Sequence, residues 1–228
     1  MKGSEPLAER AYHQIKRMLL LNELVAGQKI RYQDLTNKLK VSQTPVILAL
    51  TRLENEGLVK SQANRGFFVP ELDLEEAREL YEVRAVMESF LIRATAENIS
   101  DEQLAHLREL MDQHRALRSE VYRRERLWQD AKLHLALAAM SGHRIGEQIL
   151  RQVFDRLYLR YRPERLSSVR MQEAETEHEA LFEALSAHDG ARAEKLLRSH
   201  IERGTYHMLK GLREDFQLRD SFAVELTV

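Results

Sequence analysis

An aspartate and a histidine interrupt an apolar helical pattern in the sequence WQDAKLHLALAAM, which covers residues 128–140. In a helix, Leu133 and Leu137 fall on one face, because 3.6 residues make one turn. Asp130 and His134 fall on that same face, four residues apart. Burying such groups without partners costs on the order of 1–3 kcal/mol each, and more for an ionised carboxylate. The pattern therefore predicts a partner that both side chains share.

Two further histidines lie on apolar stripes of other predicted helices. His178 shares a stripe with Leu181, and His200 shares one with Leu197. A divalent metal ion can serve all four polar groups, because side chains at positions i and i+4 reach one point and two imidazoles can close from neighbouring helices. Three nitrogens and one oxygen favour zinc or nickel, with manganese or cobalt as alternatives. Core histidines satisfied by ordinary hydrogen bonds are the other interpretation, which the spacing leaves open.

One arginine also lies on an inward stripe, whereas most other histidines do not. Arg84 shares its stripe with Leu80, Met87 and Leu91, so its guanidinium can point toward the interior. A guanidinium pairs bidentately with carboxylates, although a structural ion pair or an exposed edge position would explain Arg84 equally. Most of the remaining histidines are expected on the surface; they are His13, His106, His114, His143, His188 and His207.

The composition is that of an ordinary globular protein with a basic first part. Of the 228 residues, 43% are hydrophobic, and the net charge is −1. Residues 1–70 contain 11 basic and 6 acidic residues, a net charge of +5. The rest of the chain contains 24 basic and 30 acidic residues, a net charge of −6. A basic segment favours a polyanionic partner, or is a chance cluster of solvated charges. Without cysteine, thiolate ligands are excluded. No apolar run is long enough to span a membrane and no signal peptide is evident, so we expect a cytoplasmic protein.

Residues 1–70 predict a winged helix-turn-helix domain. Two helices are expected before residue 40, separated by the turn at Ala26-Gly27. A third helix follows Ser42 and ends at Gly57, which can adopt the left-handed conformation. Leu58–Val59 and Phe67–Val69 then predict two strands of a hairpin around the turn 63–66. Three helices followed by a hairpin is the order of a winged helix.

Residues 71–228 predict an all-α antiparallel bundle of about six helices. Two capping-box patterns mark helix starts, Asp73 with Glu76 and Ser100 with Gln103. The tail from Gln217 has no clear assignment. The predicted helices cover residues 74–98, 101–117, 123–141, 144–161, 170–187 and 190–213.

Several stretches resemble one family of regulators. VSQTPVILALTRLENEGLV followed by NRGFFV resembles the winged helix of GntR-type transcription regulators. ELYEVRAVME, DAKLHLALAAMSGH and HEALFEALSAHDGARAEKLLRSH resemble the ligand-binding domain, called FCD, of the FadR-like branch. The resemblance implies that Asp130, His134, His178 and His200 bind a divalent metal that holds a small carboxylate effector. It further implies that Arg84 clamps that organic acid.

The predicted recognition helix departs from the family pattern. Its two usual arginines are replaced by Gln43 and Ile47, and Leu48 stands where glutamate is common. Gln43 can still bond adenine and Ile47 can touch a thymine methyl, whereas an exposed Ile47-Leu48 pair would also suit a protein contact. Other DNA contacts are expected from nearby positions, each with solvated surface as the alternative. These are Arg31, Thr44, Arg52, Arg65 and Gly66.

The resulting prediction is a ligand-responsive transcription regulator, a repressor that acts as a homodimer on double-stranded operator DNA. Two recognition helices in one dimer predict an operator that is an imperfect palindrome. A regulator that senses the metal directly, without an organic effector, is the first alternative. A metalloenzyme is the second, and we expect no enzymatic activity because no suitable general base is evident.

Overall fold

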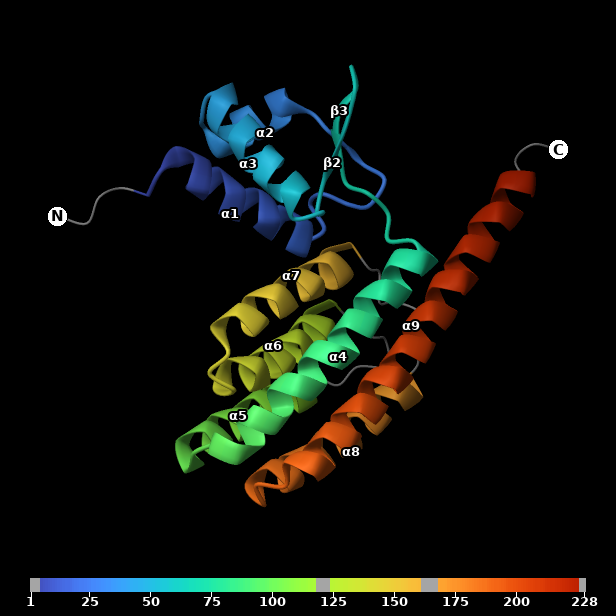
Figure 1. Ribbon diagram of the computed structural model, residues 1–228. Coiled ribbons are helices and arrows are strands. Elements are labelled where there is room, and N and C mark those ends of the chain that lie inside the picture. Colours follow the sequence, from blue (N-terminus) through green and yellow to red (C-terminus); the bar gives the residue numbers. More distant parts are fainter. Residues whose placement is uncertain (1–4, 118–123, 161–167, 226–228) are drawn as a thin grey trace. The chain divides into compact units, whose positions relative to one another are not determined.

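The computed structural model describes residues 5–117, 124–160 and 168–225. These residues form helices and one small three-stranded sheet, and they divide into two compact units (Figure 1). The first unit contains residues up to Leu72 together with Asp155–Tyr161, and the second contains the rest. The mainly helical fold predicted from the sequence is confirmed.

The first unit is a winged helix. Its helices are α1 (Leu7–Leu20), α2 (Tyr32–Leu39) and α3 (Gln43–Asn55), and its strands are β1 (Lys29–Ile30), β2 (Lys60–Gln62) and β3 (Gly66–Phe68). The strands are antiparallel in the order β1-β3-β2. Phe67 in the central strand lies opposite Ile30 on one side and Ser61 on the other. The wing is therefore a sheet of three strands.

Two strands, β1 and β2, differ from the sequence prediction. Strand β1 was not predicted, and β2 covers Lys60–Gln62 instead of Leu58–Val59. Leu58 and Val59 are buried in the core of the first unit, whereas all three residues of β2 are exposed. Apolar side chains mark the buried turn before the strand, and pairing with β3 defines the strand itself.

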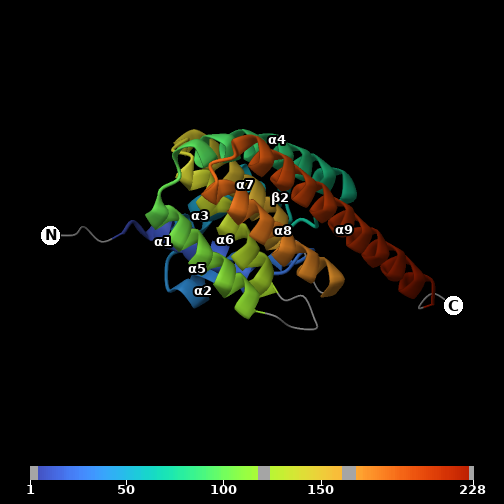
Figure 2. The ribbon, with the colours of Figure 1, turned by 90° about the horizontal axis from the view of Figure 1, so that it is seen from below.

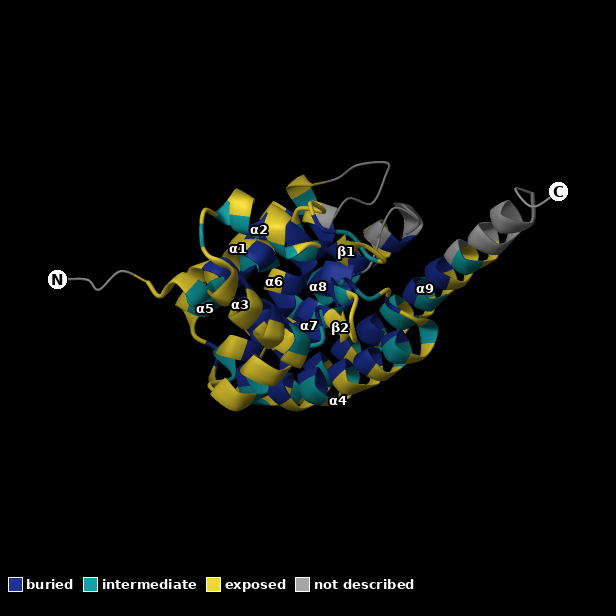
Figure 3. Ribbon diagram, turned by 90° about the horizontal axis from the view of Figure 1, so that it is seen from above, coloured by how far each residue is buried: buried dark blue, intermediate teal, exposed yellow. Residues whose placement is uncertain are grey.

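The second unit is a helical bundle. Its helices are α4 (Leu74–Asn98), α5 (Asp101–Ala116), α6 (Arg124–Met140), α7 (Arg144–Arg160), α8 (Ser168–Ser186) and α9 (Gly190–Glu225). α4 lies beside α9 in both views (Figures 1 and 2), α8 also packs on α9, and α5 packs on α6 and α8. Buried and exposed residues alternate along α4 and α9 (Figure 3), as expected for amphipathic helices.

Side chains fix where two of these helices begin. The Asp73 carboxylate accepts a hydrogen bond from the backbone N–H of Glu76. Ser100 and Gln103 form a reciprocal capping box, in which each side chain accepts from the other residue's backbone N–H. These contacts satisfy helix N–H groups that have no partner within the helix. The chain past Gln217, which had no prediction, continues α9 as far as Glu225.

Helix α7 contributes to both units. Its residues up to Phe154 belong to the second unit, and Asp155 onward belongs to the first. Within the first unit, Asp155 pairs with Lys16, Arg156 Nε donates to the carbonyl of Glu56 at 2.9 Å, and Leu159 is part of the apolar core. None of the helices in the described residues combines the length and apolar character that crossing a bilayer requires.

Candidate metal centre

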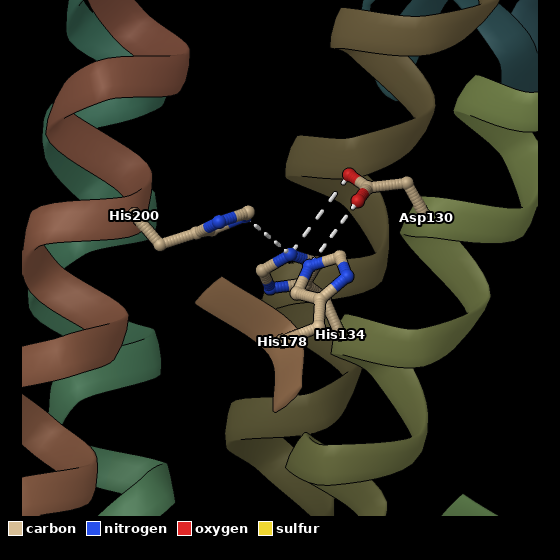
Figure 4. A group of neighbouring side chains, drawn as sticks. All are labelled: Asp130, His134, His178 and His200. Atoms are coloured by element: carbon tan, nitrogen blue, oxygen red, sulfur yellow. Dashed lines mark hydrogen bonds and ion pairs between the residues drawn. The ribbon is translucent and has the colours of Figure 1, made fainter. Parts of the chain in front are cut away.

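Four side chains of the second unit converge on one point (Figure 4). Asp130 and His134 lie one turn apart on α6, His178 comes from α8, and His200 comes from α9. One ligand atom from each lies within 4.8 Å of every other. The Asp130 carboxylate is 3.8 Å from His134 Nε2 and 3.6 Å from His178 Nε2. The four residues singled out from their helical stripes therefore form one cluster.

All four groups are buried, and the pKa shifts of Asp130, His178 and His200 suit a metal ligand set. Burial alone would raise the pKa of Asp130, but the neighbouring imidazoles outweigh it and hold that pKa well below the ordinary value. Burial also lowers the pKa of His178 and of His200. A carboxylate and neutral imidazoles are the forms that bind divalent metals.

Two carboxylates outside the cluster orient two of its histidines. His134 Nδ1 is hydrogen-bonded to Glu88, and His200 Nδ1 donates to Glu177 Oε2 at 2.6 Å. Burial would raise the pKa of Glu88, but Arg84 and His134 outweigh it and lower this pKa to about 2. An ionised carboxylate only accepts hydrogen bonds, so each Nδ1 carries the proton. Each Nε2 is then left with a lone pair, which is the metal-binding tautomer.

The resulting lone pairs face one another without a hydrogen donor. His134 Nε2 lies 3.2 Å from His200 Nε2. His178 Nε2 is buried and has no hydrogen-bond partner among the described residues. Two nitrogens that bind one ion at about 2.1 Å with tetrahedral or octahedral angles are roughly 3.0–3.4 Å apart. The donor set and its spacing therefore fit a divalent cation.

Arg84 is buried beside this cluster and already has a carboxylate partner. Its Nε donates to Glu88 Oε1 at 2.6 Å, and its guanidinium lies 4.4 Å from the centre of the Phe154 ring. The inward orientation expected from the stripe is thus present. Arg84 is linked to His134 through Glu88, which bonds both side chains.

Sequence reasoning missed three residues around the cluster. His114, expected on the surface, is buried on α5, with its ring centre 5.4 Å from that of His178 and its Nε2 4.0 Å from Asp130 Oδ1. Its spacing from Leu107, Leu110 and Met111 would have revealed this burial. Glu88 follows Arg84 by one turn and could have been found likewise. Glu177 immediately precedes His178 in sequence, and adjacent helical positions do not share a face, so the spacing alone would direct its side chain away from the cluster. It points instead to His200.

The DNA-contact candidates lie in the first unit. Arg31, Gln43, Arg65 and Gly66 line one surface groove of about 800 Å³, together with Gln62 and Asn64 of the wing. Thr44, Ile47 and Leu48 are exposed on α3. Arg52 differs from the others, because its guanidinium stacks on the Tyr12 ring at 3.7 Å and pairs with Glu9 at 2.7 Å. Its charge is therefore already compensated within the first unit.

Two family models match the chain, one for each kind of domain. Residues 7–69 match the gntR family of bacterial regulatory proteins, and residues 79–203 match the FCD domain. The Nta operon transcriptional regulator of Aminobacter aminovorans is 33% identical over 58% of this chain and 62% of its own length. The transcriptional regulator BphR of Paraburkholderia xenovorans is 30% identical over 86% of this chain and 82% of its own length. The repressor GlaR of Escherichia coli is 27% identical over 83% of this chain and 90% of its own length.

Solved structures share the fold. McbR/YncC of E. coli has a TM-score of 0.76 at 21% identity, covering 90% of this chain and 98% of that one. A GntR transcriptional regulator from Rhodococcus sp. RHA1 has a TM-score of 0.73 at 22% identity, and the match covers 89% of this chain and 97% of that one. The two matching families and the relatives named above are transcription regulators rather than enzymes, which removes the metalloenzyme alternative. The chain belongs to the gntR family of bacterial regulatory proteins, as a DNA-binding transcription regulator with an FCD ligand-binding domain.

Proposed function

We propose that this regulator is a cytoplasmic homodimeric repressor whose FCD domain holds a divalent metal and a small carboxylate effector. The metal ligands are Asp130, His134, His178 and His200, and zinc or nickel suits them best. The effector alters the affinity of the winged helix for an operator that is an imperfect palindrome. GlaR, one of the relatives, is a repressor, which supports the same sign of regulation here.

The observation that carries the proposal is the pair of imidazole nitrogens 3.2 Å apart whose other nitrogens face carboxylates. In that tautomer His134 and His200 repel each other unless a cation lies between them. A divalent metal removes the repulsion and also satisfies His178 Nε2. When bound, such an ion offers a Lewis-acidic position to an additional oxygen ligand.

The charges around the cluster favour an anion as that additional ligand. Three buried arginines of the second unit each pair with a glutamate, in Arg84–Glu88, Arg126–Glu175 and Arg170–Glu177. The half-exposed Arg203 also pairs with Glu177. Asp130 adds one negative charge and a divalent metal adds two positive charges. The resulting net positive charge favours a small carboxylate, and Arg84 is the guanidinium that we propose to bind it.

Linkage explains how such an effector would change DNA binding. An acid that binds one conformation of the protein more tightly shifts the population toward it, and couplings of this kind amount to about 1–3 kcal/mol. Two chain segments are suited to transmit the change. The short link from Val69 to Asp73 joins β3 to α4, and α7 contributes residues to both units.

The first experiment is elemental analysis of the untagged protein beside two histidine variants. His134→Ala removes a proposed ligand, whereas His106→Ala removes an exposed histidine on α5 and serves as the matched control. We expect about one metal per chain in the wild type and in His106→Ala, and substantially less in His134→Ala. Operator affinity is then measured with metal alone and with metal plus each of a panel of small organic acids.

The outcomes separate the proposal from its alternatives. A change in operator affinity that requires an acid in addition to the metal supports the proposal, and Arg84→Ala should then reduce the affinity for that acid. A full response to metal alone would identify a direct metal sensor. Absence of metal, or equal metal in His134→Ala, would mean that the four side chains are hydrogen-bonded core groups.

A further inference from the structure

The exposed face at the start of the recognition helix carries no charge. Residues 43–51 contain no lysine, arginine, aspartate or glutamate, and the nearest arginine on the helix, Arg52, is paired with Glu9 and stacked on Tyr12. The side chains of this face that reach solvent are an amide, two hydroxyls and two branched apolar groups. They are Gln43, Thr44, Ile47, Leu48 and Thr51.

The amide and the apolar groups have a preferred base edge in the major groove, whereas a threonine hydroxyl does not select one base. A glutamine side chain bonds the N6 and N7 atoms of adenine, and apolar groups contact the C5-methyl group of thymine. Guanine is most often read by arginine or lysine, and the cytosine amino group by aspartate or glutamate. Since the face offers none of these charged groups, it lacks the usual means to select a G·C pair.

The groove beside the recognition helix contains both amide groups and cations. The groove that Gln43 lines is also lined by the amides of Gln62 and Asn64 and by the cations Arg31 and Arg65. Arg65 occupies the tight turn before Gly66, whose φ is +90°, and its side chain has no ion-pair partner within the described residues. Arginine side chains bind backbone phosphates, and such contacts carry no direct sequence information. The cations can thus bind phosphates and raise affinity without selecting any base pair.

We infer that this protein selects its operator through A·T pairs, with Gln43 reading an adenine and Ile47 and Leu48 contacting thymine methyl groups. The inference rests on the DNA-binding function and adds the chemistry of the sequence that is recognised. Arg31 and Arg65 contribute affinity, whereas the uncharged face of α3 contributes the selectivity.

A selection from random duplexes with the full-length protein at low salt tests the assignment of Gln43. We expect half-sites in which the selected positions are A·T pairs. Gln43→Ala should reduce discrimination at one adenine position by about tenfold, and Gln43→Arg should favour guanine there. Arg65→Ala is the matched control, since it should weaken binding to all sequences alike. Thermal melts of each variant establish that it is folded.

Substituting deoxyuridine for thymine in the selected operator tests the apolar contacts, because it removes only the C5-methyl groups. Wild-type affinity should fall several-fold, and the fall should shrink in Leu48→Ala and Ile47→Ala. Half-sites dominated by G·C pairs, or a selectivity unchanged in Gln43→Ala, would overturn the inference. Binding without any sequence preference would also overturn it while leaving DNA binding intact. A complete absence of DNA binding would instead contradict the regulatory function itself.

Discussion

Glu177 shows how a residue outside the proposed ligand set can fix the tautomer of one of its histidines. Its carboxylate bonds His200 Nδ1 at 2.6 Å and is held by Arg170 at 2.9 Å and Arg203 at 2.6 Å. The carboxylate keeps the proton on Nδ1 and makes Nε2 a stronger donor to a metal. Glu88 does the same for His134. These two glutamates therefore prepare both imidazoles for coordination.

Replacing this carboxylate should weaken metal binding without removing a ligand. We expect Glu177→Gln to lower the affinity for zinc by about 10–100-fold, measured by competition with a chelator, because a neutral amide polarises the imidazole less. Glu173→Gln, one turn earlier on α8 and exposed, is the matched control and should bind zinc as the wild type does. Equal affinity in all three proteins would contradict the positioning role.

At this scale the sequence indicated the four clustered side chains better than the residues that support them. Asp130, His134, His178 and His200 could be found because each interrupts an apolar stripe of its own helix. Their assignment as metal ligands stays a proposal. Glu177 could not be found, because a glutamate within one helix has no local sign that it faces a histidine 23 residues away on the next.

At the scale of elements, the end of α3 depends on one glycine. Gly57 has a φ of +75°, as its predicted left-handed conformation requires. A Cβ atom added there would lie 2.6 Å from Nε of Arg156, the side chain that donates to the Glu56 carbonyl. Both the backbone conformation and the neighbouring side chain therefore oppose any other residue at this position.

Two glycine substitutions can separate these effects. Gly57→Ala should destabilise the protein by about 1–3 kcal/mol, from the strained conformation and from the displaced arginine. Gly142→Ala is the control, because Gly142 has the same φ of +75° but no atom within 4 Å of an added Cβ. Chemical unfolding should show the larger loss for Gly57→Ala. An equal loss of unfolding free energy in the two variants would mean that the contact with Arg156 does not contribute to the effect of Gly57→Ala.

Helices were predicted more closely than strands, for a physical reason. The bundle helices carry periodic apolar stripes and local caps such as Ser100 with Gln103, so their bounds follow from nearby residues. Strand β1 has only two residues, and its pairing with β3 joins positions almost forty residues apart. No local pattern encodes such a pairing.

At the scale of the whole molecule, one apolar patch lacks a cover within the described residues. Val86 and Phe90 on α4 are 65% and 59% exposed, and Ile145 on α7 is 74% exposed. The two helices are in close contact there, because a Cβ added to Gly146 would lie 2.9 Å from Leu91 Cδ2. An exposed apolar patch can face its own copy across a two-fold axis, as the proposed homodimer requires.

A charge within this patch should therefore weaken the dimer. We expect Phe90→Glu to raise the dimer dissociation constant by at least about tenfold, measured by light scattering over a range of concentrations, because a buried unpaired carboxylate is costly. Tyr206→Glu, which changes an exposed aromatic residue on α9, should leave the dimer intact. A wild-type monomer, or equal dissociation constants for both variants, would contradict this interface.

The sequence indicated two parts but not which residues complete the first. The predicted division falls after residue 70, whereas the first unit continues to Leu72 and also includes Asp155–Tyr161. Nothing in the α7 sequence distinguishes residues that join one unit from those that join the other, since both halves continue the same helical pattern.

This discontinuity has a consequence for biosynthesis and for protein engineering. Leu159 lies in the core of the winged helix, and Asp155 and Arg156 bond Lys16 and Glu56. A ribosome must therefore synthesise more than half of the bundle before the DNA-binding unit has all its core residues. For the same reason, exchanging residues 1–72 between relatives as a cassette would separate this unit from part of its own core unless the end of α7 is exchanged with it.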